Sequence, residues 1–293
     1  MKIKGFICFI VFFISSLSIR SHAEIYGLVL SGGGGKGGYE VGVWKALTEY
    51  GIAQKVLVIS GTSVGGLNAA LFAVTPVSRI ENIWLDEVPV ELNRDGKAIS
   101  QKGLKNIMSG LSLSKLNRKS SPYVYVTCSR SWKGAVGKIG DVVMQGLKSA
   151  TKSVFDYSYR FCLNSEDSVD EIKQKLLATS AFPGLTSPVR LSDGYLYSDG
   201  GATDNTPVEP VTWHDADVIF VVHLSCWTPD LQEGKWQGRK IIDIVPSREM
   251  RWFGGMLDFT REWAEDNIKL GYSDTVKILK KMGLNPVSGW WFR

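Results

Sequence analysis

The apolar positions of this chain predict strands that alternate with helices. A short apolar run at residues 25–30 predicts a strand, and apolar residues at helical spacing over residues 39–50 predict the helix after it. A second apolar run at residues 55–60 and small residues at 67–71 repeat this order. Such repetition of strand, turn and helix is typical of an α/β protein with parallel strands.

The same pattern continues along the chain. Residues 168–179 are predicted to form a helix, because Ser168 and Glu171 occupy the positions of a capping box. We therefore predict an α/β fold, a three-layer α/β/α sandwich in which a mixed, largely parallel sheet lies between helical layers. Further strands are predicted at residues 122–128, 155–163 and 218–222.

Three stretches are predicted to be helical with less regular patterns. Residues 77–88 have amphipathic spacing, and residues 257–282 predict one long or broken helix. Between the first two predicted halves of the sheet, residues 89–121 lose a clear period. They form either a helical excursion on the surface or a lid or channel over an active site.

A glycine-flanked serine follows the second predicted strand. Gly61-Thr62-Ser63-Val64-Gly65 matches G-x-S-x-G between an apolar strand and a small-residue helix, which is the context of a nucleophile elbow. The glycines leave room for a strained turn, and the hydroxyl then lies at a helix N-terminus, where free N–H groups favour negative charge. The pattern predicts that Ser63 is a nucleophile.

Two further segments complete a candidate site. The first predicted strand ends at a glycine-rich loop, residues 32–37, whose amides can converge on one anion. The carboxyl ends of adjacent parallel strands face one crevice, so we expect this loop beside Ser63. A serine also needs a base. Asp199 is the candidate, because a strand-like segment precedes it, two glycines follow it, and partial burial would raise its pKa.

In these residues the sequence resembles the patatin-like phospholipase family. Four motifs carry the resemblance in the family's order: the loop 32–37, the elbow 61–65, the segment 180–184 and residues 199–201, which are followed by Asn205-Thr206-Pro207-Val208. Together they cover roughly residues 26–225. Two positions depart from the pattern: Lys36 stands where many bacterial members have arginine, and His223 stands where an acidic or small residue is expected.

The resemblance implies a lipid acyl hydrolase of the phospholipase A type that needs no histidine, metal or cofactor. Ser63 would be the nucleophile and Asp199 the base, with a phospholipid or other lipid ester as substrate and transient contact with a membrane surface. Gly61, Gly65, Gly200 and Gly201 would support the turns. The oxyanion hole would come from the amides of Gly32, Gly33, Gly34, Gly35, Lys36 and Gly37.

Other interpretations of the same residues remain open. A dinucleotide site fits the spacing Gly32, Gly34, Gly37 but lacks the acidic residue after the second strand, and a P-loop lacks serine or threonine after Lys36. An α/β-hydrolase triad would use Ser63, Asp199 and either His214 or His223 in the order serine, acid, histidine. A binding module with a degenerate site would lack the serine or the aspartate, and both are present.

The N-terminus has the features of a secretory signal peptide. Lys2 and Lys4 precede an apolar run at residues 5–17, and small residues follow at 21–23. A membrane anchor is the alternative, although the run is shorter than the ~20 residues that a spanning helix needs. We expect export of the chain, which would make it secreted, periplasmic or membrane-associated.

Composition agrees with a globular protein of one main domain. The 293 residues are 44% hydrophobic and 22% charged, and the three positive charges of residues 1–23 account for part of the net charge of +5, leaving +2. Nothing here indicates a nucleic-acid partner. We divide the chain into a signal peptide (1–23), a patatin-like catalytic domain (24–225) and a helical, tryptophan-rich extension packed on that domain (226–293).

Cysteine and tryptophan add two smaller expectations. Cys128, Cys162 and Cys226 have neither metal-ligand nor C-x-x-C spacing, so we expect buried thiols, with one disulfide as the alternative. Seven of the ten tryptophans lie between residues 213 and 291. They either pack the last helix onto the core or meet a membrane interface.

Overall fold

The computed structural model describes residues 24–93, 99–131, 155–166, 168–227, 232 and 234–287. The predicted signal peptide and the terminal tryptophan pair lie outside the described residues. Among those that are described, no helix is both long and apolar enough to cross a bilayer.

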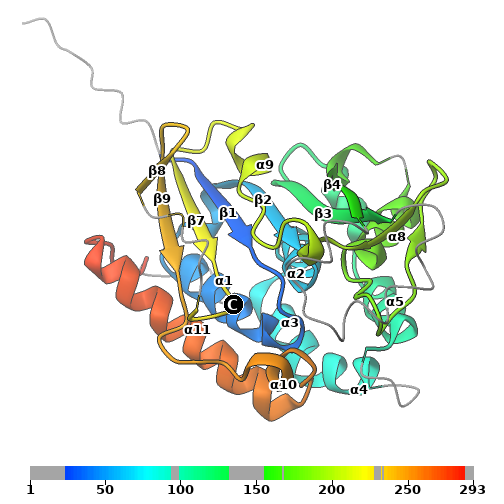
Figure 1. Ribbon diagram of the computed structural model, residues 1–293. Helices are drawn as coiled ribbons and strands as arrows, with labels where there is room; N and C mark the ends of the chain where they lie inside the picture. The colour runs from blue at the N-terminus through cyan, green and yellow to red at the C-terminus, as the bar shows by residue number, and fades with distance from the viewer. Residues whose placement is uncertain are drawn as a thin grey trace, which may run out of the picture.

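The described strands form one nine-stranded sheet (Figure 1). Its order is β5-β6-β3-β2-β1-β7-β9-β8, and β4 also pairs with β3. The central strands β3, β2, β1, β7 and β9 are parallel, whereas β4, β5, β6 and β8 join antiparallel. This confirms the predicted α/β fold with a mixed sheet. The strands are β1 (Tyr26–Leu30), β2 (Val56–Thr62), β3 (Tyr123–Ser131), β4 (Phe155–Cys162), β5 (Val189–Arg190), β6 (Leu196–Asp199), β7 (Val218–Val222), β8 (Gly234–Trp236) and β9 (Arg239–Ile244).

Side chains of the central strands alternate between two apolar layers. Leu28 and Leu30 of β1 join the large core with the helices of one face, whereas Val29 joins a smaller core with Val211 on the other face. Figure 1 shows α1 and α11 on the first face and α9 on the second. The helices are α1 (Gly38–Glu49), α2 (Val64–Val74), α3 (Val77–Asn82), α4 (Val88–Leu92), α5 (Gln101–Ser109), α8 (Val169–Thr179), α9 (Glu209–Thr212), α10 (Trp252–Met256) and α11 (Arg261–Lys281).

The segment 226–293, predicted to be helical, also extends the sheet. It contributes α10 and α11, but β9 pairs with β7 and β8 completes a hairpin with β9. Gln237 and Gly238 both have positive φ, 47° and 85°, which suits a two-residue hairpin turn. The strand was missed because its apolar run, Ile241 to Ile244, is short and interrupted by Asp243.

Other predictions differ in smaller ways. Residues 77–88, expected to form one helix, divide into α3 and a π-helical turn at Ile83–Glu87, after which α4 begins at Val88. The loop expected at 180–190 ends in the short strand β5. Cys128, Cys162 and Cys226 are free thiols, although only Cys128 is fully buried.

Candidate active site

The predicted elbow is a sharp turn between β2 and α2. Ser63 caps α2 with φ 54° and ψ −125°, a backbone conformation that a residue with a side chain rarely adopts. A Cβ added to Gly61 would lie 2.3 Å from the Gly65 carbonyl, and one added to Gly65 would lie 2.4 Å from the Leu30 oxygen. Both glycines are therefore needed for β2 and α2 to pack this closely.

Strand pairing explains why Ser63 and Asp199 meet. Thr62, the last residue of β2, pairs with Thr127 of β3, and Asp199, the last residue of β6, pairs with the next β3 residue, Cys128. Because β2 runs parallel and β6 antiparallel to β3, their carboxyl ends point at each other along one edge of β3. The structure thus brings the predicted nucleophile and base together from distant parts of the chain.

Asp199 is buried, with 4% of its surface exposed. Burial raises its pKa to about 6, although the nearby Ser63 hydroxyl and the Gly201 amide act to lower it. Oδ1 accepts a hydrogen bond from Gly201 N at 2.8 Å, whereas the buried Oδ2 has no partner of standard geometry among the described residues. The Ser63 contact is therefore loose, as hydrogen bonds in active sites often are before substrate binds.

The glycine-rich loop lies directly beside Ser63. A Cβ added to Gly32 would lie 3.2 Å from the Ser63 Cβ, and Gly34 has φ 57° with Met256 O 2.2 Å from an added Cβ. The Gly32 amide donates to Asn205 O and the Lys36 amide to Gly33 O, at 3.1 and 3.3 Å. Among the described residues, the amides of Gly33 and Gly34 donate no hydrogen bond, so they are available to an oxyanion.

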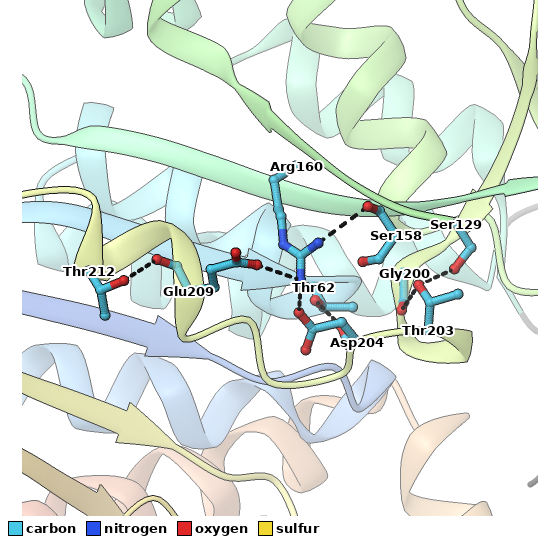
Figure 2. Close-up of polar contacts among 9 residues, drawn as sticks. All are labelled: Thr62, Ser129, Ser158, Arg160, Gly200, Thr203, Asp204, Glu209 and Thr212. Atoms are coloured by element: carbon cyan, nitrogen blue, oxygen red, sulfur yellow. Dashed lines mark hydrogen bonds and ion pairs between the residues drawn. The ribbon is translucent and has the colours of Figure 1, made fainter. Parts of the chain in front are cut away.

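A polar network holds the loop after Asp199 against the sheet (Figure 2). Arg160 of β4 contacts the carboxylates of Asp204 at 2.8 Å and Glu209 at 3.2 Å. Thr62 Oγ1 donates to Asp204 O at 2.8 Å, so the residue before Ser63 is tied to the same loop. Ser129 of β3 bonds Thr203 at 2.8 Å, and the Thr203 hydroxyl also reaches Gly200 O. The network fixes Asp199 relative to the elbow.

A second network ties the glycine-rich loop to the elbow helix. Asn68 of α2 donates to Gly37 O at 3.1 Å and to Glu40 Oε2 at 2.8 Å, and its own oxygen accepts from Trp84 Nε1 at 3.0 Å. Glu40 is fully buried, and burial raises its pKa well above the ordinary value despite the Asn68 hydrogen bond. The carboxyl is therefore neutral at neutral pH.

Sequence reasoning missed these supporting residues. Asn205 was noted only as part of a motif, yet it accepts from Gly32 N and donates to Gly32 O at 3.3 Å. Thr179 accepts from Ser63 N at 3.0 Å and donates to Thr127 O at 2.6 Å, which fixes the elbow backbone. Each acts across a long sequence separation, so no local pattern identifies it.

Ser63 and Asp199 line a cavity of about 400 Å³. One end lies between α2, α5 and the residues that join α4 to α5, and it is apolar. The region 89–121, for which a surface excursion or a channel was expected, thus contributes an inner wall. Apolar residues that line this end are Leu67, Ala70, Leu71, Val88, Leu92, Ile99, Leu104, Ile107, Met108, Leu111 and Leu176.

The opposite end of the cavity is polar and partly open. Lys36 and His223 line it, although only 3% of each residue is exposed. Burial lowers the pKa of Lys36. At the rim, Trp227 is 78% exposed and Leu185 37% exposed. The cavity thus joins an apolar interior to a mouth with buried cationic groups and exposed apolar side chains.

The two histidines of the alternative triad lie in different places. His214 is not among the residues that line the cavity, and its ring contacts the Tyr125 hydroxyl at 3.0 Å. His223 lines the cavity, but Nε2 lies 2.5 Å from Asp243 of β9, not from Asp199. Leu30 of β1 pairs with Gly61 on one side and Val222 on the other, so two strand spacings, roughly 10 Å, separate the elbow from His223.

Comparisons with known proteins agree with this arrangement. The chain is 29% identical to a lysophospholipase nte1 of Aspergillus terreus over 228 residues, which cover 74% of this chain and 13% of the relative. It is 24% identical to a patatin-like phospholipase domain-containing protein of Cryptococcus neoformans over 294 residues, covering 92% and 32%. The chain thus spans a minor part of the length of these curated relatives.

A solved structure and a family model point to the same fold. VipD from Legionella pneumophila superposes with a TM-score of 0.51 at 14% identity, covering 88% of this chain and 67% of that one. The model of the patatin-like phospholipase family matches residues 28–212, a span that contains the glycine-rich loop, the elbow and Asp199. From this match over most of the chain, we conclude that the protein is a member of the patatin-like phospholipase family.

Proposed function

We propose that the protein hydrolyses acyl esters of lipids through Ser63 and Asp199. The observation that carries this proposal is the position of Asp199, a buried carboxylate of raised pKa beside the Ser63 hydroxyl at the mouth of an apolar cavity. A base with a pKa of about 6 is largely ionised at neutral pH, yet it is basic enough to accept a proton during attack. The apolar cavity suits a fatty acyl chain.

The proposed reaction has two halves. Ser63 Oγ attacks the ester carbonyl carbon while its proton passes to Asp199, and the free amides of Gly33 and Gly34 bind the oxyanion. The intermediate collapses to an acyl-serine, and the leaving alkoxide takes the proton from Asp199. Water then attacks the acyl-serine, Asp199 accepts its proton, and the serine is restored as the fatty acid leaves.

Two substitutions test the proposal. Ser63→Ala should abolish fatty-acid release from phospholipid vesicles, and Asp199→Asn should lower kcat by ~10³-fold, because the serine loses its base. Circular dichroism and thermal unfolding establish that both variants are folded. Fatty-acid release by folded Ser63→Ala at the wild-type rate would contradict the assignment.

A histidine-dependent triad is the second candidate, because His223 lines the same cavity. The strand spacing and the tie of His223 to Asp243 favour the dyad. The dyad predicts that His214→Gln and His223→Gln both retain hydrolysis of a neutral ester. The triad predicts a loss of ~10³-fold or more for one of them.

Contact with a membrane surface is part of the proposal. Trp227 and Leu185 are exposed and line the mouth, so a lipid that enters the cavity would leave a bilayer past apolar side chains. The relatives named lysophospholipases support a phospholipid substrate. Export of the chain stays a prediction of the N-terminal sequence.

A further inference from the structure

The buried pair His223 and Asp243 has no role in the proposed reaction. His223 follows β7 and Asp243 belongs to β9, and the side chains are 4% and 2% exposed. Both oxygens of Asp243 also accept from the Gln232 amide, each at 3.0 Å. An ionised carboxylate only accepts hydrogen bonds, so Nε2 of the imidazole carries the hydrogen. Nδ1 is the ring atom left for another partner.

This pair lies next to a second buried cation. Lys36 is influenced by Cys226, three residues beyond His223, and both Lys36 and His223 line the polar end of the cavity. Within the described part of the chain, Lys36 forms no ion pair. A buried ammonium group without a counter-ion favours an anion beside it.

The geometry of an ester places its alcohol part at this end. The free amides of Gly33 and Gly34 follow β1, and β2 with Ser63 lies on one side of β1 while β7 with His223 lies on the other. The apolar end of the cavity lies toward α5, which packs on α8 far from β7 (Figure 1). With the carbonyl at the amides and the acyl chain toward α5, the alcohol part extends toward β7.

We infer that His223, oriented by Asp243, acts with Lys36 as the recognition site for a phosphate group in the alcohol part of the substrate. This inference rests on the proposed function and makes it more specific. The preferred substrates are glycerophospholipids and lysophospholipids, whose phosphate lies a few bonds from the ester, over neutral glycerides. His223 is a specificity-determining residue and takes no part in proton transfer to Ser63.

Matched substrates test the inference. We compare kcat/KM for a lysophosphatidylcholine and for a monoacylglycerol with the same acyl chain, both as monomers. His223→Gln should lower the ratio of the two values about tenfold, mainly through KM, because a charge-assisted hydrogen bond to phosphate is lost. His214→Gln is the matched control and should leave the ratio unchanged, since His214 does not line the cavity.

The alternative role of the pair is a tie between β7 and β9, and the same assay distinguishes it. An equal loss on both substrates, or an unchanged ratio in folded His223→Gln, would overturn the inference while leaving the proposed function intact. Loss of all activity in Ser63→Ala is expected in either case. If His223→Gln does not fold, Asp243→Asn keeps the shape of the pair and should lower the ratio in the same direction.

A spectroscopic measurement separates a lipid head group from free phosphate. The chain has three histidines, so ¹⁵N imidazole signals of the Ser63→Ala protein can be assigned by substitution. Lysophosphatidylcholine should shift the His223 signals and monoacylglycerol should not. A shift with inorganic phosphate alone, and none with the lysophospholipid, would overturn the head-group assignment.

Discussion

At the scale of residues, the site depends on two buried carboxyl groups with different tasks. Asp199 has a pKa raised to about 6 and lies beside Ser63, so it is ionised at neutral pH. Glu40 has a pKa raised well above its ordinary value and lies in the network of Asn68 and Trp84, so it is neutral there. Burial explains both shifts, and the polar neighbours of each determine how far its pKa moves.

The raised pKa of Asp199 predicts the pH dependence of activity. The base works only when ionised, so kcat/KM should be constant above the pKa and fall about tenfold per pH unit below it. The half-maximal value is expected near pH 6. A pH–rate profile on a neutral monomeric ester measures this, and a midpoint near pH 4 would show that Asp199 is not the group that titrates.

Glu40 predicts a pH-dependent stability. Its native pKa is raised, so the native state holds a proton that the unfolded state releases above about 4.5. Stability should therefore fall by ~1.4 kcal/mol per pH unit from there up to the raised pKa. Glu40→Gln removes this slope, so the variant should gain stability relative to wild type as pH rises. Urea unfolding at pH 5 and pH 8 measures the difference, with Glu81→Gln as a surface control. A difference that does not change with pH would contradict a raised pKa for Glu40.

At the scale of elements, the ends of β2, β6 and β1 converge on one cavity. The sequence predicted the elbow and the loop well, because each is a local strand, turn and helix with glycines at fixed positions. It did not predict β8 and β9, or the network of Arg160 and Asp204, because those depend on pairing between distant segments. The apolar content of α5 was visible, but only packing against α2 makes it a cavity wall.

A substitution on α5 tests this wall. Ile107 lines the cavity, so Ile107→Trp should fill its apolar end and lower kcat/KM for a sixteen-carbon acyl ester by about tenfold or more. A four-carbon ester should be hydrolysed almost as before. Lys105→Trp is the control, because Lys105 is exposed on the same helix. Equal effects on the two esters would show that the acyl chain lies elsewhere.

At the scale of the whole molecule, the cavity mouth lies at the carboxyl ends of the central strands. This is where loops after parallel strands form ligand sites, and it explains why Trp227 after β7 and Leu185 after α8 reach the same rim. The family was recognisable from the sequence because its motifs fall on these loops. The rim was not, because its residues have neighbours only in the folded chain.

The exposed rim predicts different behaviour toward vesicles and monomers. Trp227→Ala should lower hydrolysis of vesicle lipids about fivefold or more while a monomeric ester is hydrolysed at nearly the wild-type rate, because only the first substrate requires contact with a bilayer. Trp213→Ala is the matched control, since Trp213 is 53% exposed but does not line the cavity. Equal losses for the two tryptophans would argue against a specific lipid-facing mouth.

The most direct test of the account is covalent labelling of the nucleophile. A fluorophosphonate should add one adduct per chain, located on Ser63 by peptide mass spectrometry, and Asp199→Asn should slow labelling by ~10²-fold or more because the base is lost. An adduct on another residue, or labelling of Asp199→Asn at the wild-type rate, would contradict the pairing of these two side chains.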